Sequence, residues 1–317
     1  QWFKLHLWDV IMMTAVASAG LLTGWWVRRI IADDAMITFR VAENLAAGRG
    51  FVFNPGEYVQ VTTTPLYAML LAAGSWLVGS APDAALILNI ALAAINPVLA
   101  YDVGRRLSGR LTGVSAALLL VLMPPLVIAF SMESYLYVFL ILASLDAYAA
   151  QRWPLAGVIV GITAVLRGDA VLMGACMVTY DVLAYRRLRW RLIVPAIVIP
   201  AGWYLFATVY YGSPFPATLQ AKVAQGELNW LGEYFISGFL EYWESWTIED
   251  YYHPELYLVP GLYLLGLIPV FQRERTWLII IGRDILYVIG FELLRVTFAE
   301  WYYAPLTAGV ALMVGRG

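Results

Sequence analysis

Long apolar runs alternate with short polar segments along the whole chain. A helix needs about 20 apolar residues to cross roughly 30 Å of hydrocarbon. By this measure the candidate transmembrane helices are 7–27, 82–101, 111–130, 134–150, 154–167, 170–185, 190–210, 255–271, 277–297 and 300–314. The pattern therefore predicts an all-α polytopic membrane protein, a single domain over residues 1–317 with about ten transmembrane helices.

Composition agrees with this prediction. Of the 317 residues, 62% are hydrophobic and 13% are charged, whereas soluble domains are about one-quarter charged. A net charge of −2 without a basic arm gives no attraction to nucleic acid. The one cysteine, Cys176, excludes an internal disulfide or a cysteine metal cluster. Because the sequence begins at Gln1 and ends at Gly317, we expect it to be part of a longer protein.

Basic residues gather in short loops at 105–110, 185–191 and 272–275. The positive-inside rule places such loops in the cytoplasm. All of them lie on that side, with the amino terminus, if the short apolar run 65–79 does not cross the membrane. We therefore expect 65–79 to be an interfacial helix on the outer face, although Arg28 and Arg29 on that face oppose the rule.

Two long polar segments then lie outside the membrane, at 28–81 and 211–254. The second mixes Trp, Tyr and Phe with Glu, which is typical of a layer at headgroup depth. We expect the chemistry to lie where these two external segments face each other.

The first external segment contains the most informative stretch, DDAMITFRVAENLAAGRGFVFNPGE at 33–57. Two adjacent carboxylates open a helical pattern, which glycines stop before a Pro-Gly turn. Asp-Asp-Ala, Arg40, Asn44, Gly48-x-Gly50, Asn54 and Gly56-Glu57 together resemble the first external loop of GT-C glycosyltransferases. The bacterial enzymes that use polyprenyl-phosphate sugars are the most similar, among them arabinofuranosyltransferases and mannosyltransferases.

The resemblance implies an inverting enzyme in the bacterial cytoplasmic membrane, with its active site facing outside. Such an enzyme moves a sugar from a polyprenyl-phosphate donor to a glycan, lipid or protein acceptor of the cell envelope. Its partners are therefore lipid-linked sugar and membrane lipids, and membership of a larger membrane complex stays open.

Asp33 and Asp34 are the candidate catalytic residues. An Asp at a helix start commonly caps the free backbone N–H groups, which explains one carboxylate better than two. A carboxylate just outside a membrane span could instead take the proton of a sugar hydroxyl during its attack. In GT-C enzymes the resemblance implies this role for an acidic residue here, and Asp33 is preferred.

Glu133 lies between two spans on the same expected face as Asp33. It is either a charge at the start of a span or, as the resemblance implies, a second acidic residue of the site. Asp33 and Glu133 could then orient the acceptor or hold a divalent cation, for which oxygen ligands suit Mg²⁺, Ca²⁺ or Mn²⁺. His6 and His253 are too scattered for a histidine zinc site.

The candidates for binding the donor phosphate are Lys222, Arg40 and Arg167. Lys222 follows YGSPFPATLQ, which resembles the family's Tyr-Gly…Pro-x-Thr…Ala-Lys pattern, although Ala217 replaces the usual Asn. A lysine near headgroups often snorkels without further function. Arg167 lies in LRGD, like the family's Leu-x-Arg-x-Asp, where pairing with Asp169 is the alternative.

Asn54, Glu57, Trp301, Tyr302 and Tyr303 are the candidates for binding substrate. The segment WYYAPL, at 301–306, resembles a late GT-C segment, and its rings could stack on a sugar or a prenyl chain. An aromatic belt at the membrane surface explains them as well.

Arg283 and Asp284 stand inside an apolar run, where charges are costly unless paired. Since neighbouring residues of a helix point in different directions, we expect each to pair with other groups. They are the one hint of the alternative function, a transporter of a lipid-linked substrate. A second alternative is an inactive GT-C relative that serves as a structural subunit.

Overall fold

The computed structural model describes residues 6–219, 221, 224, 234–245, 253–272 and 275–317. Its α-helices are α1 (Leu7–Val27), α2 (Ala35–Ala46), α3 (Pro65–Val78), α4 (Ala81–Ser108), α5 (Arg110–Leu122), α6 (Pro124–Ile128), α7 (Ser134–Ala149), α8 (Trp153–Leu166), α9 (Val171–Tyr185), α10 (Trp190–Tyr211), α12 (Phe235–Glu244), α13 (Leu258–Gln272), α14 (Leu278–Leu293) and α15 (Thr307–Arg316). Short 3₁₀ helices are η1 (Gly168–Ala170), η3 (Pro254–Tyr257), η4 (Arg275–Trp277) and η5 (Glu300–Leu306). This described part contains no strand, which confirms the all-α prediction.

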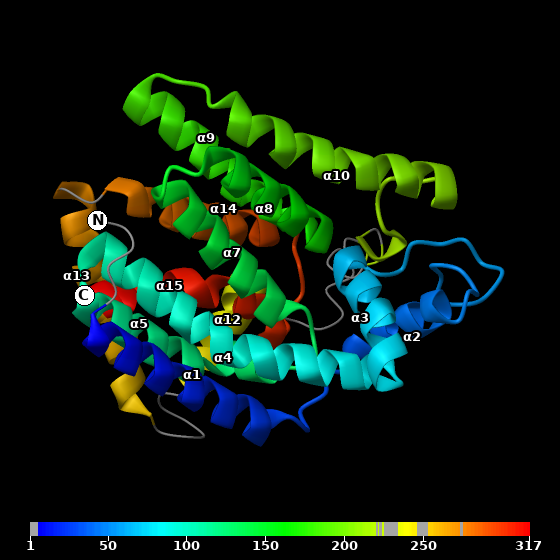
Figure 1. Cartoon of the computed structure of the whole chain (residues 1–317), viewed down its shortest axis with the longest axis horizontal. Coiled ribbons are helices and arrows are strands. Elements are labelled where there is room, and N and C mark those ends of the chain that lie inside the picture. The colour runs from blue at the N-terminus through cyan, green and yellow to red at the C-terminus, as the bar shows by residue number, and fades with distance from the viewer. Residues whose placement is uncertain (1–5, 220, 222–223, 225–233, 246–252, 273–274) are drawn as a thin grey trace.

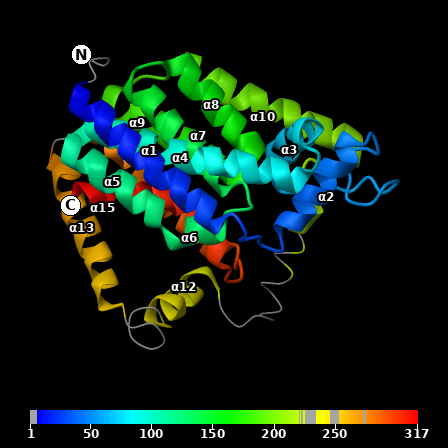
Figure 2. The same cartoon turned by 60° about the horizontal axis from the view of Figure 1, so that its bottom comes forward.

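The long helices pack side by side in one bundle (Figures 1 and 2). The helices α2 and α3 lie at one end of it, and the described termini of the chain lie toward the other end (Figure 1). The junctions α4–α5 and α9–α10, which carry the basic loops 105–110 and 185–191, lie at the end opposite α2 (Figure 1). The bundle thus has a basic end and an α2 end.

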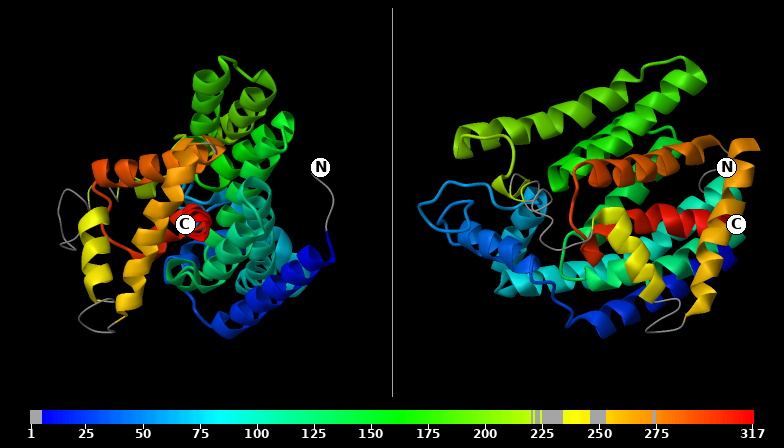
Figure 3. Two further views of the ribbon diagram at one scale, coloured as in Figure 1. Left: turned by 90° about the vertical axis from the view of Figure 1, so that its left-hand side faces the viewer. Right: turned by 180° about the vertical axis from the view of Figure 1, so that it is seen from behind.

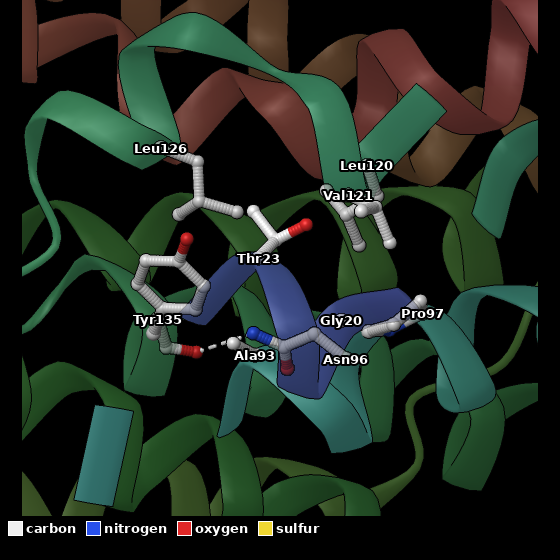
Figure 4. Close-up of a pocket in the computed structure, with 9 residues that line it drawn as sticks. All are labelled: Gly20, Thr23, Ala93, Asn96, Pro97, Leu120, Val121, Leu126 and Tyr135. Carbon is white, nitrogen blue, oxygen red and sulfur yellow. Dashed lines mark hydrogen bonds between the residues drawn. The ribbon is translucent and has the colours of Figure 1, made fainter. Parts of the chain in front are cut away.

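Small residues bring the first helices into close contact. A Cβ atom added to Gly20 of α1 would lie 2.0 Å from the carbonyl oxygen of Ala93 on α4. Asn96 of α4 donates from Nδ2 to the carbonyl oxygen of Tyr135 at 2.9 Å, and a cavity of about 10 Å³ remains beside this bond (Figure 4). That volume has room for about one water molecule, so the interior is well packed.

The apolar runs differ in length from the predicted spans. Among the described residues, three helices are long and apolar enough to cross a membrane, namely α1, α4 and α10. The run 111–130 is divided between α5 and α6, because Pro124 holds Met123 in an extended conformation. The run 300–314 is also not one helix, since η5 precedes the short helix α15.

The helices α13 and α3 do not run along the bundle. In Figures 1 and 3, α13 crosses the basic end rather than following the long axis. The run 65–79 forms α3, which packs against α2 and leaves Trp76 and Leu77 largely exposed. An interfacial position for α3 agrees with these exposed apolar side chains, and the number of membrane-crossing helices stays a prediction.

Candidate active site

Two segments far apart in the sequence meet just beyond the end of α1. The backbone N–H of Ala32 donates to Ser131 Oγ at 2.8 Å, between positions 99 residues apart. Asp33 and Asp34 follow Ala32, and Glu133 stands two positions after Ser131. The hydrogen bond therefore brings the two acidic loops of the sequence analysis to one joint at the α2 end.

Asn89 of α4 fixes the turn that contains Ser131. This fully buried amide donates from Nδ2 to the carbonyl oxygens of Phe130 at 2.5 Å and Met132 at 3.2 Å, and to the hydroxyl of Tyr67 at 2.9 Å. Tyr67 in turn donates to the carbonyl oxygen of Ser131 at 3.3 Å, since burial raises the pKa of its phenol far above the usual range. The sequence analysis missed this role, although a polar amide inside an apolar run signals a need for partners.

Asp33 stands exposed at the start of the joint. Its Oδ1 accepts from the backbone N–H of Asp34 at 2.9 Å. Asp34 occupies the residue before α2 but makes no side-chain bond to the first turn of that helix. Helix capping therefore does not explain Asp34, and Asp33 has one carboxylate oxygen facing away from this contact.

Glu133 is held by an arginine. Its Oε1 accepts from Arg167 Nη1 at 2.7 Å, and Glu133 is buried. The other nitrogens of Arg167 reach Asp169 from Nε at 3.1 Å and from Nη2 at 2.6 Å. The pairing of Arg167 with Asp169 is confirmed. With all three nitrogens engaged, Arg167 is poorly placed to take a phosphate as well.

The sequence analysis considered a divalent cation at the joint. In the part of the chain that the structure describes, no group of three or more His, Cys, Asp and Glu side chains could hold a metal ion. Glu133 is already paired with Arg167. A divalent cation held by Asp33 and Glu133, which are two carboxylates, stays a prediction.

The matched loop residues fold the segment after α2 back onto that helix. Arg40 donates from Nε to the carbonyl oxygen of Phe53 at 2.9 Å and from Nη2 to Asn54 Oδ1 at 3.2 Å. Asn54 donates to Glu57 Oε2 at 3.0 Å, and Asn44 donates to the Phe53 carbonyl oxygen at 2.8 Å. These contacts give Arg40, Asn54 and Glu57 a structural role. Binding of phosphate or substrate by them stays a prediction.

The glycines of this loop are required by its conformation. Gly48, Gly50 and Gly56 have φ angles of 70°, 101° and 90°, in the region that other residues rarely adopt. A Cβ atom on Gly50 would also lie 2.9 Å from the hydroxyl oxygen of Tyr210. The Gly48-x-Gly50 motif thus serves the shape of the loop.

Residues of the segments 28–81 and 211–254, which the sequence predicts to lie outside the membrane, contact each other. Tyr210 accepts from the backbone N–H of Phe51 at 3.1 Å, and Tyr211 donates to the Phe51 carbonyl oxygen at 2.6 Å. Further along, the backbone N–H of Ala217 donates to the carbonyl oxygen of Gln60 at 2.9 Å. Lys222 lies outside the described residues, so its phosphate-binding role stays a prediction.

The aromatic segment in η5 is packed into the bundle. Tyr303 donates to the carbonyl oxygen of Phe235 at 2.6 Å, and the carbonyl oxygen of Tyr302 accepts from Tyr287 at 2.8 Å. Tyr302 and Tyr303 are buried, and Trp301 is partly buried. These contacts give Tyr303 a structural role, and substrate binding by the three rings stays a prediction.

Arg283 and Asp284 pair with each other, contrary to the expectation of separate partners. Arg283 Nη1 lies 2.5 Å from Asp284 Oδ1 and 2.7 Å from the carbonyl oxygen of Pro305. Its Nη2 donates to the hydroxyl of Tyr137 at 2.8 Å. This buried hydrogen-bonded cluster links α14 to α7 and η5. The charges that were the hint of a transporter therefore have a structural explanation.

The fold is that of a solved membrane protein. The chain resembles ArnT from Cupriavidus metallidurans bound to undecaprenyl phosphate with a TM-score of 0.62 and 17% sequence identity, over 96% of this chain and 59% of that one. The apo structure of the same protein matches with a TM-score of 0.62 and 16% identity.

Sequence relatives agree. The chain is 29% identical over 299 residues to a terminal beta-(1->2)-arabinofuranosyltransferase of Mycobacterium tuberculosis, covering 86% of this chain and 45% of the relative. A protein of the same description from Corynebacterium glutamicum is 44% identical over 55 residues, which are 17% of this chain. No protein-family model matches the sequence.

Fold and sequence together confirm the resemblance to GT-C membrane glycosyltransferases. The arabinofuranosyltransferases are the relatives that the sequence comparison finds within this class. The chain spans less than half the length of these relatives, and about three-fifths of ArnT.

Proposed function

We propose that this chain forms the membrane part of a glycosyltransferase that moves a sugar from a polyprenyl-phosphate donor to a glycan acceptor. The observation that carries the proposal is the joint between Ala32 and Ser131, which sets an exposed Asp33 beside the loop of Glu133. Support also comes from the likeness to arabinofuranosyltransferases and from the undecaprenyl phosphate bound by ArnT.

Asp33 acts as the general base in this mechanism. It takes the proton of an acceptor hydroxyl while that oxygen bonds to the anomeric carbon of the donor sugar. The bond from the same carbon to the phosphate oxygen breaks, and the lipid phosphate leaves with the electron pair. Attack from the face opposite the phosphate inverts the configuration at this carbon.

The cluster of Glu133, Arg167 and Asp169 has a different part in the proposal. Two carboxylates and one guanidinium give it a net charge of −1, so it does not attract a phosphate by itself. In this proposal the cluster holds the loop of Ser131 in a fixed position relative to Asp33. The positive charge for the leaving phosphate is then expected from Lys222.

Asp33→Asn tests the base, with Asp34→Asn as the matched control. Asn keeps the size of the side chain and can still accept from the next backbone N–H. We expect Asp33→Asn to melt like the parent but to turn over a polyprenyl-phosphate arabinofuranose about a hundredfold slower or worse. The control should lose far less. A parent-like rate for Asp33→Asn would contradict the role of Asp33 as base. Absence of turnover by the parent protein would favour an inactive structural subunit.

The orientation in the cytoplasmic membrane, with the α2 end outside, is also part of the proposal. Its support is the basic end opposite α2. In a Cys176→Ala background, a cysteine at the exposed Glu57 should react in intact cells with an impermeant thiol reagent, and one at the exposed Arg187 should not. Labelling at Arg187 in intact cells would reverse the orientation.

A further inference from the structure

A groove lies along α2, next to the candidate active site but separate from the joint at Ser131. Its volume is about 480 Å³, within the range of small-molecule sites. The side chains that matter here are Met36, Arg40, Glu43 and Arg49, and Pro55 and Pro82 stand across from them. The groove therefore combines charged groups with an apolar edge.

The loop after α2, which contains Pro55, forms the outer wall of the groove. Hydrogen bonds from α2 and from α10 hold this loop in place. Arg40 and Asn44 bond the carbonyl oxygen of Phe53, as described above, and Tyr210 and Tyr211 hold Phe51 from α10. A wall fixed in this way needs little reordering when a ligand binds, which lowers the entropic cost of binding.

The groove has hydrogen-bonding groups to spare. Arg49 uses Nε to reach Asn44 Oδ1 at 2.8 Å, which leaves its two terminal nitrogens pointing away from that bond. Glu43 is exposed, and its side chain makes no hydrogen bond or ion pair with the described part of the chain. Donors on arginine and an acceptor on glutamate together suit a polyhydroxylated ligand.

The groove also begins close to the proposed base, Asp33. Asp33, Met36, Arg40 and Glu43 follow one another at helical spacing, so they share a face at the start of α2 and along it. At 1.5 Å per residue, Arg40 lies about 10 Å along the chain axis from Asp33. A short oligosaccharide whose end reaches Asp33 can therefore extend into the groove.

We propose that this groove binds the inner sugars of an oligosaccharide acceptor, so that the enzyme prefers a chain of sugars to a single one. The proposal rests on the function proposed above, because it takes the end of that acceptor to be the attacking group. Glu43 accepts from sugar hydroxyls, and Arg49 donates to ring and hydroxyl oxygens. The apolar edge at Met36 covers a sugar face.

The double variant Glu43→Gln with Arg49→Ala tests the groove. The probes are a synthetic arabinofuranosyl tetrasaccharide and the corresponding monosaccharide glycoside. A hydrogen bond to a charged group is worth roughly tenfold in affinity. We expect the ratio of kcat/KM for the tetrasaccharide to that for the monosaccharide to fall about tenfold or more. Arg29→Ala, an exposed charge change outside the groove, should leave the ratio unchanged.

Binding of the tetrasaccharide without donor, measured by saturation-transfer NMR, separates this proposal from the proposed function. Binding by the parent that is lost in the double variant supports the groove, even if no sugar is transferred. Absence of transfer by the parent would count against the proposed function alone. Equal tetrasaccharide binding by parent and double variant, no binding by the parent, or an unchanged ratio would overturn the groove as an acceptor site.

Discussion

The carboxylates at the two ends of the bundle have opposite surroundings. At the basic end, Asp9 pairs with Arg110, Asp102 with Arg105 and Arg106, and Asp181 with Arg189. At the α2 end, Asp33 accepts from a backbone N–H, and Glu43 has no cationic partner among the described residues. Glu133 is intermediate, since it pairs with Arg167 close to the joint.

This difference separates assembly from chemistry. A buried carboxylate next to an arginine stays charged and holds helices together, because removing either partner leaves an uncompensated charge. A carboxylate that is not paired with a cation has an oxygen available to accept a proton from a substrate hydroxyl. The comparison therefore predicts losses of stability at the basic end and losses of turnover at the α2 end.

Arg189→Met should have the largest effect on stability. Arg189 Nε bonds Asp181 at 2.8 Å, and its guanidinium lies 3.7 Å from the ring centre of Trp153. Asp181 is almost fully buried, and without Arg189 it keeps only the hydroxyl of Tyr148 among these partners. We expect the free energy of unfolding to fall by about 3 kcal/mol in a thermal melt of the purified protein.

The control for this variant is Arg187→Met, in the same loop but exposed. It should change stability by less than about 0.5 kcal/mol. Turnover per folded molecule should match the parent in both variants. A loss of turnover with an unchanged melting temperature in Arg189→Met would contradict the assignment of stability to the basic end and of chemistry to the α2 end.

Asn89→Leu should affect both stability and turnover, because it acts on the joint. The variant leaves the carbonyl oxygens of Phe130 and Met132 without their buried donor. We expect a loss of about 2 kcal/mol in unfolding free energy. Since Ser131 would shift relative to Asp33, kcat should fall more than KM rises. Asn89→Asp keeps the shape but not the donor, and parent-like turnover in both variants would remove Asn89 from the joint.

Gly50→Ala should have the smallest effect, of about 1 kcal/mol on stability. Its φ of 101° disfavours Ala, and the added Cβ would press on the Tyr210 hydroxyl. Gly48→Ala has a φ of 70° but nothing within 4 Å of the added atom, so it isolates the backbone contribution. A difference in acceptor KM between the two, measured with the tetrasaccharide, would show whether the wall of the groove matters.

Much of the fold was predictable because hydropathy marks helices well. The runs 7–27 and 134–150 correspond closely to α1 and α7. Hydropathy cannot distinguish an α-helix from a 3₁₀ helix, so the change at η5 was missed even though Pro305 lies there. The break before Pro124 did have a signal in the sequence, the adjacent Pro124 and Pro125.

The residues of the candidate site could be proposed from the sequence, but their arrangement in space could not. Asp33 and Glu133 could be picked from their positions at span ends and from the family resemblance. Their meeting depends on Ala32 and Ser131, whose contact spans 99 positions and leaves no local pattern. The arginines show the same limit. Arg40 and Arg167 were recognisable as cations in the sequence. Their hydrogen bonds to Phe53 and to Asp169 follow from the packing of the folded chain.

The buried hydrogen-bonded cluster around Arg283 has a consequence for membrane insertion during synthesis. The sequence predicts that the run 277–297, which contains α14, crosses the membrane. Tyr137 precedes this run in the chain, and Pro305 follows it. A lone charge at the middle of a membrane helix costs about 2.5–3.5 kcal/mol on insertion. Asp284 is the counter-ion that α14 carries within itself, so the segment can enter as a neutral pair. The last contact, with the carbonyl oxygen of Pro305, then fastens the end of the chain onto helices inserted earlier.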